Sequence, residues 1–178
     1  MVLSAKDFRA DCANCVGLCC VAFVFDSSDD FAIDKPADVP CPNLRDDYLC
    51  SIHDSLEKEG FGGCARYDCL GAGQLVTQEL FEGRGWRENP AQFAPMMQTF
   101  RNAREVQSLR AMLVSAGRFP LSKAENEKRL GLLAECEPGG DWSRAWIDGI
   151  LAGTVPRRVK NFLTSLRHHI ERGRRPLR

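Results

Sequence analysis

Eight cysteines crowd into the first 69 residues of this 178-residue chain, and four of them fall within "CANCVGLCC". Cys12, Cys15 and Cys19 have the spacing i, i+3 and i+7, which places side chains on one face of a helix, with neighbouring Cβ atoms about 5–6 Å apart. Cys20 projects about 100° away from Cys19 around a helix axis. A segment this rich in thiols is expected to fold around what the thiols bind, because it has little apolar core of its own.

The other cysteines come from a different kind of sequence. Four of them follow in segments rich in proline, aspartate and glycine: Cys41, Cys50, Cys64 and Cys69. Such positions suit ligands that complete a site begun by a local cluster. The ninth, Cys136, stands alone in a helical pattern and is expected to be a buried apolar residue.

Three interpretations compete for the eight thiols. Four thiolates hold one zinc ion or one four-iron cluster, so eight allow one or two centres. A disulfide framework needs an oxidising compartment, and simple burial does not require so many cysteines. Zinc versus iron–sulfur stays open, because C-x2-C-x3-C-C is neither the paired CxxC of a zinc ribbon nor the ferredoxin run. We favour metal binding by Cys12, Cys15, Cys19, Cys20, Cys41, Cys50, Cys64 and Cys69.

Bulk features narrow the setting of the chain. It has no run of 18 apolar residues, and "MVLSAKDFRADC" lacks the apolar stretch of a secretory signal, so we expect a cytoplasmic protein without a membrane span. Residues 1–60 carry a net charge of −7, which disfavours nucleic-acid binding. The basic "ERGRRPLR" end is expected to be a solvated helix end. A protein partner and the oligomeric state stay open.

Local patterns in the cysteine-rich half predict short elements. Ser4 and Asp7 resemble a capping box for a helix over about 5–20. "VAFVF" (21–25) and "YLCSI" (48–52) predict strands. The glycine-rich "FGGCARYDCLGAG" predicts backbone bent around a bound group.

Beyond Trp86 the pattern becomes helical. Helices are expected over about 90–116, 122–136, 141–153 and 156–170, the second opened by the capping box "SKAE". The apolar stripe of the first comprises Met96, Met97, Phe100, Ala103, Val106, Leu109 and Leu113. The expected fold is α+β and mostly α: a small cysteine-rich metal- or cluster-binding module over 1–82, then a C-terminal helical region of about four helices over 90–178 that packs on it.

The motifs "DCANCVGLCC", "PCPNL", "YLCSIH" and "GGCARYDC", in that order, resemble the YkgJ-like CxxCxxCC cysteine-cluster family. That family is a zinc- or iron-chelating domain whose relatives include flagellin lysine N-methylases. "FAIDKPADVPCPNL", "GAGQ-x-V-x-Q" and "WR" further resemble a module at the front of bacterial pentapeptide-repeat proteins, over roughly residues 10–90. On this resemblance the family's cysteine positions carry over to the same eight residues.

The chain departs from the family pattern in three ways. Three residues separate Cys15 from Cys19 where the family name has two, His53 stands where tyrosine is usual, and no pentapeptide repeats follow. We expect His53, His168 and His169 to face solvent. The resemblance implies a zinc- or iron–sulfur-binding interaction or structural module, with no catalytic residue named. The alternative is an iron–sulfur-dependent enzyme, such as a protein-lysine N-methyltransferase that uses S-adenosylmethionine.

Overall fold

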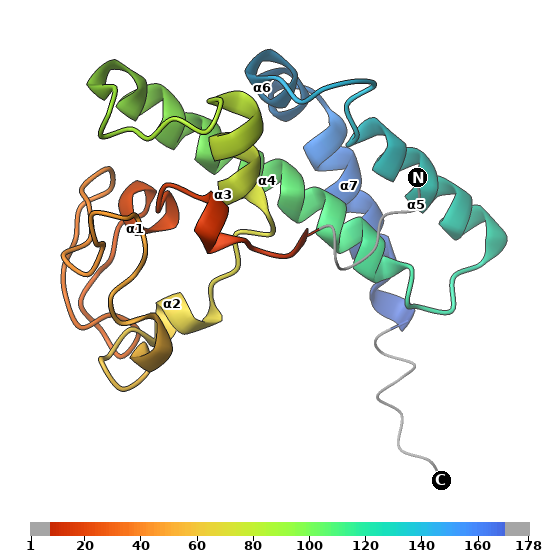
Figure 1. The fold of residues 1–178 in the computed structure, drawn as a ribbon. Coiled ribbons are helices and arrows are strands. Elements are labelled where there is room, and N and C mark those ends of the chain that lie inside the picture. Colours follow the sequence, from red (N-terminus) through yellow and green to blue (C-terminus); the bar gives the residue numbers. More distant parts are fainter. Residues whose placement is uncertain (1–7, 170–178) are drawn as a thin grey trace, which may run out of the picture. The chain divides into compact units, whose positions relative to one another are not determined.

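The computed structural model describes residues 8–169, which divide into two compact units (Figure 1). The cysteine unit spans residues 9–104, and the helical unit comprises Phe8 and residues 105–169. The division falls inside helix α4 (Phe93–Ala116), not in the segment 82–90. Compactness does not establish which parts fold independently. The predicted domains 1–82 and 90–178 therefore stay a prediction.

The cysteine unit consists of short helical pieces joined by loops (Figure 1). The pieces are η2 (Cys12–Asn14), α1 (Cys19–Ala22), η3 (His53–Ser55), α2 (Gly62–Arg66), α3 (Ala72–Gln74), the π-helical η4 (Leu75–Leu80) and η5 (Pro90–Gln92), followed by the start of α4. Between α1 and η3 the chain pairs only through isolated antiparallel bridges: Phe25 with Lys35, Ser28 with Phe31, and Leu44 with Cys50.

The predicted strands over 21–25 and 48–52 are wrong, whereas the prediction of a mostly helical chain is confirmed. Val21 and Ala22 are the buried end of α1, and Cys50 meets Leu44 at a single bridge. A short apolar run such as "VAFVF" does not distinguish a buried strand from a buried helix end by its periodicity. Within residues 8–169 the β component of the predicted α+β fold is therefore reduced to bridges.

The four predicted C-terminal helices are present: α4, α5 (Lys123–Glu135), α6 (Arg144–Ala152) and α7 (Val155–Ser165). The capping box of α5 forms, with Glu125 N donating to Ser122 Oγ at 3.3 Å and Ser122 N donating to Glu125 Oε2 at 2.7 Å. Helix α6 begins at Arg144 after its cap Ser143, a few residues later than the predicted start near 141. The seven-residue stripe predicted for α4 is buried throughout.

Two further expectations concern membrane spanning and the two ends of the sequence. No helix within residues 8–169 has the length and apolar character needed to cross a membrane. The Ser4–Asp7 capping box, Ile170 and the "ERGRRPLR" segment lie outside the described residues.

Candidate metal centre

The backbone from Cys12 to Cys20 is a turn, a bend and a short helix. Turn η2 ends at Cys15, whose backbone is extended with φ −125° and ψ 140°. Gly17 follows with φ +68°, and a Cβ there would lie 2.6 Å from Leu44 Cδ1. Only glycine adopts this conformation at little cost. The described part of the predicted 5–20 helix is therefore wrong, and Cys12, Cys15 and Cys19 do not share a helix face.

Side chains of the segment 72–80 hold this cysteine loop in place through its backbone. Gln74, Thr77 and Gln78 have the spacing i, i+3 and i+4, which puts them on one side of a helical segment. The hydrogen bonds, donor first, are Gln74 Nε2 to Arg9 O (2.8 Å), Asp11 N to Gln74 Oε1 (3.2 Å), Val16 N to Thr77 Oγ1 (3.3 Å) and Gln78 Nε2 to Asn14 O (3.0 Å). The "GAGQ-x-V-x-Q" motif thus positions the loop that carries the first cysteines.

Cys12, Cys15 and Cys69 form a first thiol group. A Cβ added at the buried Gly73 would lie 2.7 Å from Cys15 Sγ and 3.7 Å from Cys69 Sγ, so both sulfurs border the same glycine. Burial raises the pKa of the Cys15 thiol to about 12, and its neighbours Cys19 and Cys69 add to the rise. Burial also raises the pKa of Cys12, with the same two neighbours contributing.

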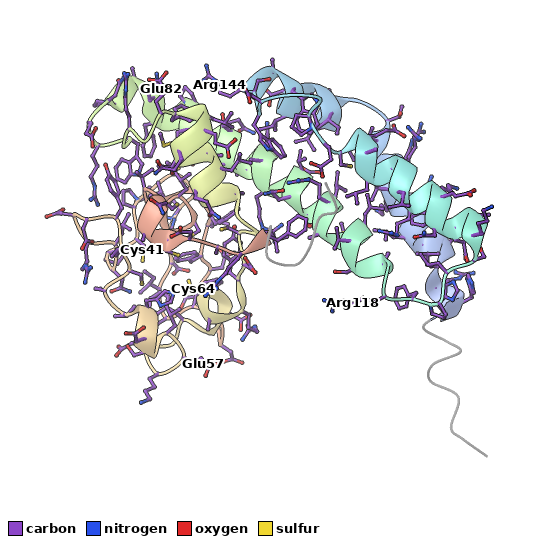
Figure 2. All side chains as sticks on the ribbon, turned by 45° about the vertical axis from the view of Figure 1, so that its right-hand side comes forward. Cys41, Glu57, Cys64, Glu82, Arg118 and Arg144 are labelled. Atoms are coloured by element: carbon purple, nitrogen blue, oxygen red, sulfur yellow. The ribbon has the colours of Figure 1, made fainter. Side chains whose placement is uncertain are left out.

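Cys41, Cys50 and Cys64 form a second thiol group in the irregular part of the cysteine unit, where Figure 2 marks Cys41 and Cys64. Burial raises the pKa of Cys64 to about 11, and the neighbours Cys19, Cys41 and Cys50 add to it. Burial also raises the pKa of Cys41, with Cys50 as a contributing neighbour. Leu44 connects two of these cysteines, because its N–H donates to Cys41 O at 3.0 Å and the residue bridges to Cys50.

Cys19 and Cys20 are adjacent at the start of α1, with their sulfurs 4.0 Å apart. Cys19 is an electrostatic neighbour of every member of the first thiol group and also of Cys41 and Cys64 in the second. Cys20 lies toward the second group: its carbonyl accepts from Cys41 N at 2.9 Å, and it is an electrostatic neighbour of Lys35 together with Cys41 and Cys64. The thiols thus form two groups of three with Cys19 and Cys20 between them. Assigning Cys19 to the first group and Cys20 to the second gives two sets: Cys12, Cys15, Cys19 and Cys69, and Cys20, Cys41, Cys50 and Cys64.

Lys35 is a buried cation beside the second set, with 3% of its surface exposed. Its Nζ donates to the carbonyls of Val21 (3.2 Å), Phe23, Pro36 (3.0 Å) and Val39 (2.9 Å). Burial lowers the pKa of Lys35, while Cys41, Cys20 and Cys64 raise it. An ammonium group in this position offsets the negative charge that thiolates bring when they bind a metal.

Tyr67 supplies a hydroxyl group near the first set. The hydroxyl is buried, and within residues 8–169 its proton has no acceptor. Burial and the neighbouring Cys19 raise the pKa of Tyr67, and Arg104 lies over its ring at 5.7 Å. Hydrogen bonds to ligating sulfurs are a common second layer around thiolate centres. A hydroxyl without an acceptor beside Cys19 and Cys69 fits a bound centre whose sulfurs accept its proton.

The cysteine thiols are free to bind a metal, but their sulfur atoms are not drawn together into a tight group of three. All nine cysteines are free. Across residues 8–169, no three cysteine sulfurs lie within 4.8 Å of one another. Four sulfurs around one zinc ion, with bonds of about 2.3 Å, lie about 3.8 Å apart. A four-iron cluster holds its thiolates farther apart, because each binds a different iron. The sulfurs of the described residues are therefore not gathered at the spacing of a single zinc site.

Sequence reasoning named all eight cysteines of this unit, and it placed two other residues well. Cys136 is fully buried in the helical unit, as predicted. His53 is exposed, with Nδ1 3.5 Å from the exposed Asp54 carboxylate, as predicted. Lys35 and Gly73 were missed. A lysine in an Asp- and Pro-rich loop has the pattern of a surface charge, and "GAG" gives no sign that its second glycine touches sulfur.

Comparison with known proteins gives one relative. The chain is 49% identical over 94 residues to a protein of Bacillus subtilis (strain 168) described as "Uncharacterized protein YybG". The match covers 53% of this chain and 34% of the relative, so the chain spans about a third of that protein's length. No protein-family model and no solved structure matches the chain.

Proposed function

We propose that the cysteine unit is a metal-binding interaction or structural module of the YkgJ-like kind, holding two thiolate-ligated centres, zinc or iron–sulfur. The observation that carries the proposal is that eight free thiols lie within one compact unit, as two groups of three with the adjacent Cys19 and Cys20 between them. One centre uses Cys12, Cys15, Cys19 and Cys69, and the other uses Cys20, Cys41, Cys50 and Cys64.

A bound metal would offset the cost of ionising these buried thiols. Burial and mutual repulsion raise the pKa values of Cys12, Cys15, Cys41, Cys64 and Cys69, so thiolates in these places need a cation beside them. A bound metal provides that cation. It also adds folding free energy to a unit whose helices before α4 have at most six residues.

The test is elemental analysis with an absorption spectrum on protein purified without oxygen. We expect about two zinc ions or about eight irons per chain. Cys12→Ser and Cys50→Ser should each remove half of the metal, whereas Cys136→Ser should retain all of it. Metal-free protein with eight reactive thiols would overturn metal binding. Complete loss of metal in both single variants, from protein that remains folded, would overturn the division into two centres.

A further inference from the structure

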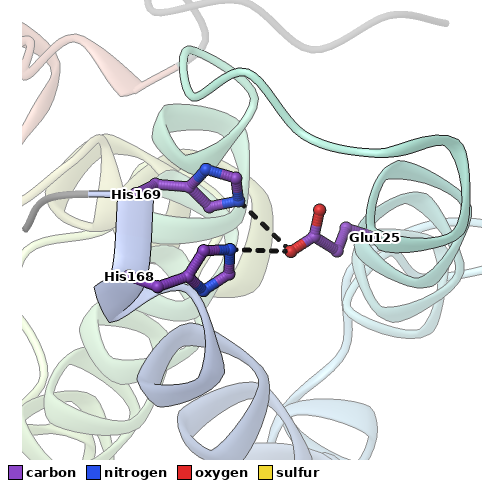
Figure 3. A group of neighbouring side chains, drawn as sticks. All are labelled: Glu125, His168 and His169. Atoms are coloured by element: carbon purple, nitrogen blue, oxygen red, sulfur yellow. Dashed lines mark hydrogen bonds and ion pairs between the residues drawn. The ribbon is translucent and has the colours of Figure 1, made fainter. Parts of the chain in front are cut away.

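A different ligand cluster lies in the helical unit, beyond the end of α7 (Figure 3). Glu125 comes from the first turn of α5, and His168 and His169 come from the short helical stretch 167–169 that follows α7. One donor atom from each of the three lies within 4.8 Å of the others. The expectation that both histidines face solvent is wrong for His169, because its side chain is 6% exposed.

Both histidines point at the same carboxylate oxygen. His169 Nε2 lies 3.2 Å from Glu125 Oε1, and His168 Nε2 lies 3.5 Å from it (Figure 3). The other oxygen, Oε2, accepts from the N–H and the hydroxyl of Ser122 at 2.7 and 2.6 Å. The capping box therefore fixes the carboxylate and leaves Oε1 directed at the two imidazoles.

The tautomer of His168 follows from its second nitrogen. His168 Nδ1 lies 2.9 Å from Ser165 O, and a carbonyl oxygen only accepts, so Nδ1 carries the hydrogen. In neutral His168 the lone pair of Nε2 then faces Glu125 Oε1, which is also an acceptor. Two acceptors face each other stably only with a positive charge between them, either a proton or a metal ion. A histidine that donates its other N–H to a carbonyl is the usual arrangement in metal sites.

The two imidazoles lie close enough together to act on one bound ion. The ring centroids of His168 and His169 are 3.9 Å apart, and the ring of His169 is parallel to that of Phe119, with centroids 6.0 Å apart. A divalent ion at this point would bind one nitrogen of each imidazole and the carboxylate oxygen together.

We propose that Glu125, His168 and His169 bind a divalent transition-metal ion of the zinc type. Two imidazoles and one carboxylate are a common three-residue ligand set for zinc, with water completing the coordination. The side chains of His168 and Glu125 are 41% and 26% exposed, which leaves a route for the ion and its water. The site uses no cysteine and lies in the helical unit, so it does not depend on the proposed function of the cysteine unit.

The experiment is a zinc titration followed by NMR of the histidine rings, on the full chain as isolated without oxygen. The chain has three histidines, so its ring spectrum is simple and contains an internal control. Zinc should shift the ring signals of His168 and His169 together, in an equimolar step, and leave those of the exposed His53 unchanged. The histidine signals report on this site whether or not the cysteines hold metal, so failure of either proposal is recognised separately.

Variants separate ligation from support of the fold. Glu125→Gln and His168→Gln should each weaken zinc binding, as read from the remaining histidine signals, by at least about tenfold. His53→Gln is the matched control and should leave the titration unchanged. Unshifted His168 and His169 signals at a large excess of zinc would overturn the proposal, as would an unaltered titration in Glu125→Gln. The wild-type spectrum decides the first point by itself, so the proposal can be refuted even if a variant fails to fold.

Discussion

Replacing Gly73 by alanine tests whether packing around the first thiol group controls its metal binding. The new Cβ would lie 2.7 Å from Cys15 Sγ, whereas ordinary contact begins at 3.4 Å. The sulfur must therefore move by about 0.7 Å, well beyond the roughly 0.2 Å within which metal–ligand distances are held. Cys69 Sγ, at 3.7 Å, can stay where it is. We expect Gly73→Ala to lose the metal of the Cys12, Cys15, Cys19 and Cys69 set.

The effect on stability has two opposing parts. Alanine in place of a helical glycine stabilises a helix by about 1 kcal/mol. Crowding a packed interior costs about 1–3 kcal/mol, so the metal-free variant should lose about 0–2 kcal/mol of unfolding free energy. Gly131→Ala is the control: Gly131 is exposed within α5, and nothing lies within 4 Å of the added Cβ. That variant should gain up to about 1 kcal/mol and keep all of its metal.

The assay combines metal per chain with urea unfolding of the metal-free proteins. We expect Gly73→Ala to retain half of the wild-type metal and its helical circular dichroism, and Gly131→Ala to retain all of it. A full complement of metal in Gly73→Ala, bound as tightly as in the wild type, would refute the placement of Cys15 in a ligand set. A rise in stability equal to that of Gly131→Ala would refute the predicted crowding.

Three further predictions concern buried groups. Burial raises the pKa of Cys136 to about 11, so its thiol is protonated at pH 8. Cys136 in the folded protein should therefore react with iodoacetamide roughly a hundredfold more slowly than in urea, and the reaction should accelerate as the pH rises toward 11. Equal rates in the folded and the urea-unfolded protein would contradict this prediction. Tyr67→Phe should leave the metal-free protein at least as stable but shift the absorption or potential of the loaded protein, and an unchanged spectrum would exclude the hydroxyl as a donor to sulfur. Lys35→Met should lower the unfolding free energy by about 1–3 kcal/mol in a urea titration, because it leaves buried carbonyls without a donor; unchanged stability would show that these bonds contribute little.

The helical unit was predictable because its signals are local. Ser122 and Glu125 are three residues apart and form their capping box from neighbouring atoms alone. The apolar spacing that predicted the buried face of α4 is likewise a property of one helix. The sequence did not predict the role of Glu125 toward His169, because that contact joins residues 44 positions apart.

The cysteine unit was predictable in composition but not in arrangement. Eight thiols in a short stretch identify candidate ligands whatever the backbone does. The helix expected before Cys20 is broken at Gly17, whose positive φ and close approach to Leu44 both require a residue without a Cβ. The loop is then held by Gln74 and Gln78, from residues more than 60 positions away. Periodicity carries no information about such long-range bonds, so the sorting of the thiols into two sets needed the structure.

The adjacent pair Cys19 and Cys20 raises the question of whether one centre can survive the loss of the other. Both cysteines belong to α1, a helix of only four residues that has little stability of its own. If metal ligation alone held this helix, losing one centre would also displace the ligand of the other. Protein contacts also hold α1. Val21 is fully buried, and Arg101 donates to Ala22 O at 3.0 Å while pairing with Asp38 at 2.7 Å. Because these contacts involve no sulfur, Cys20 should keep its position when Cys12 or Cys15 is altered, and half of the metal should remain.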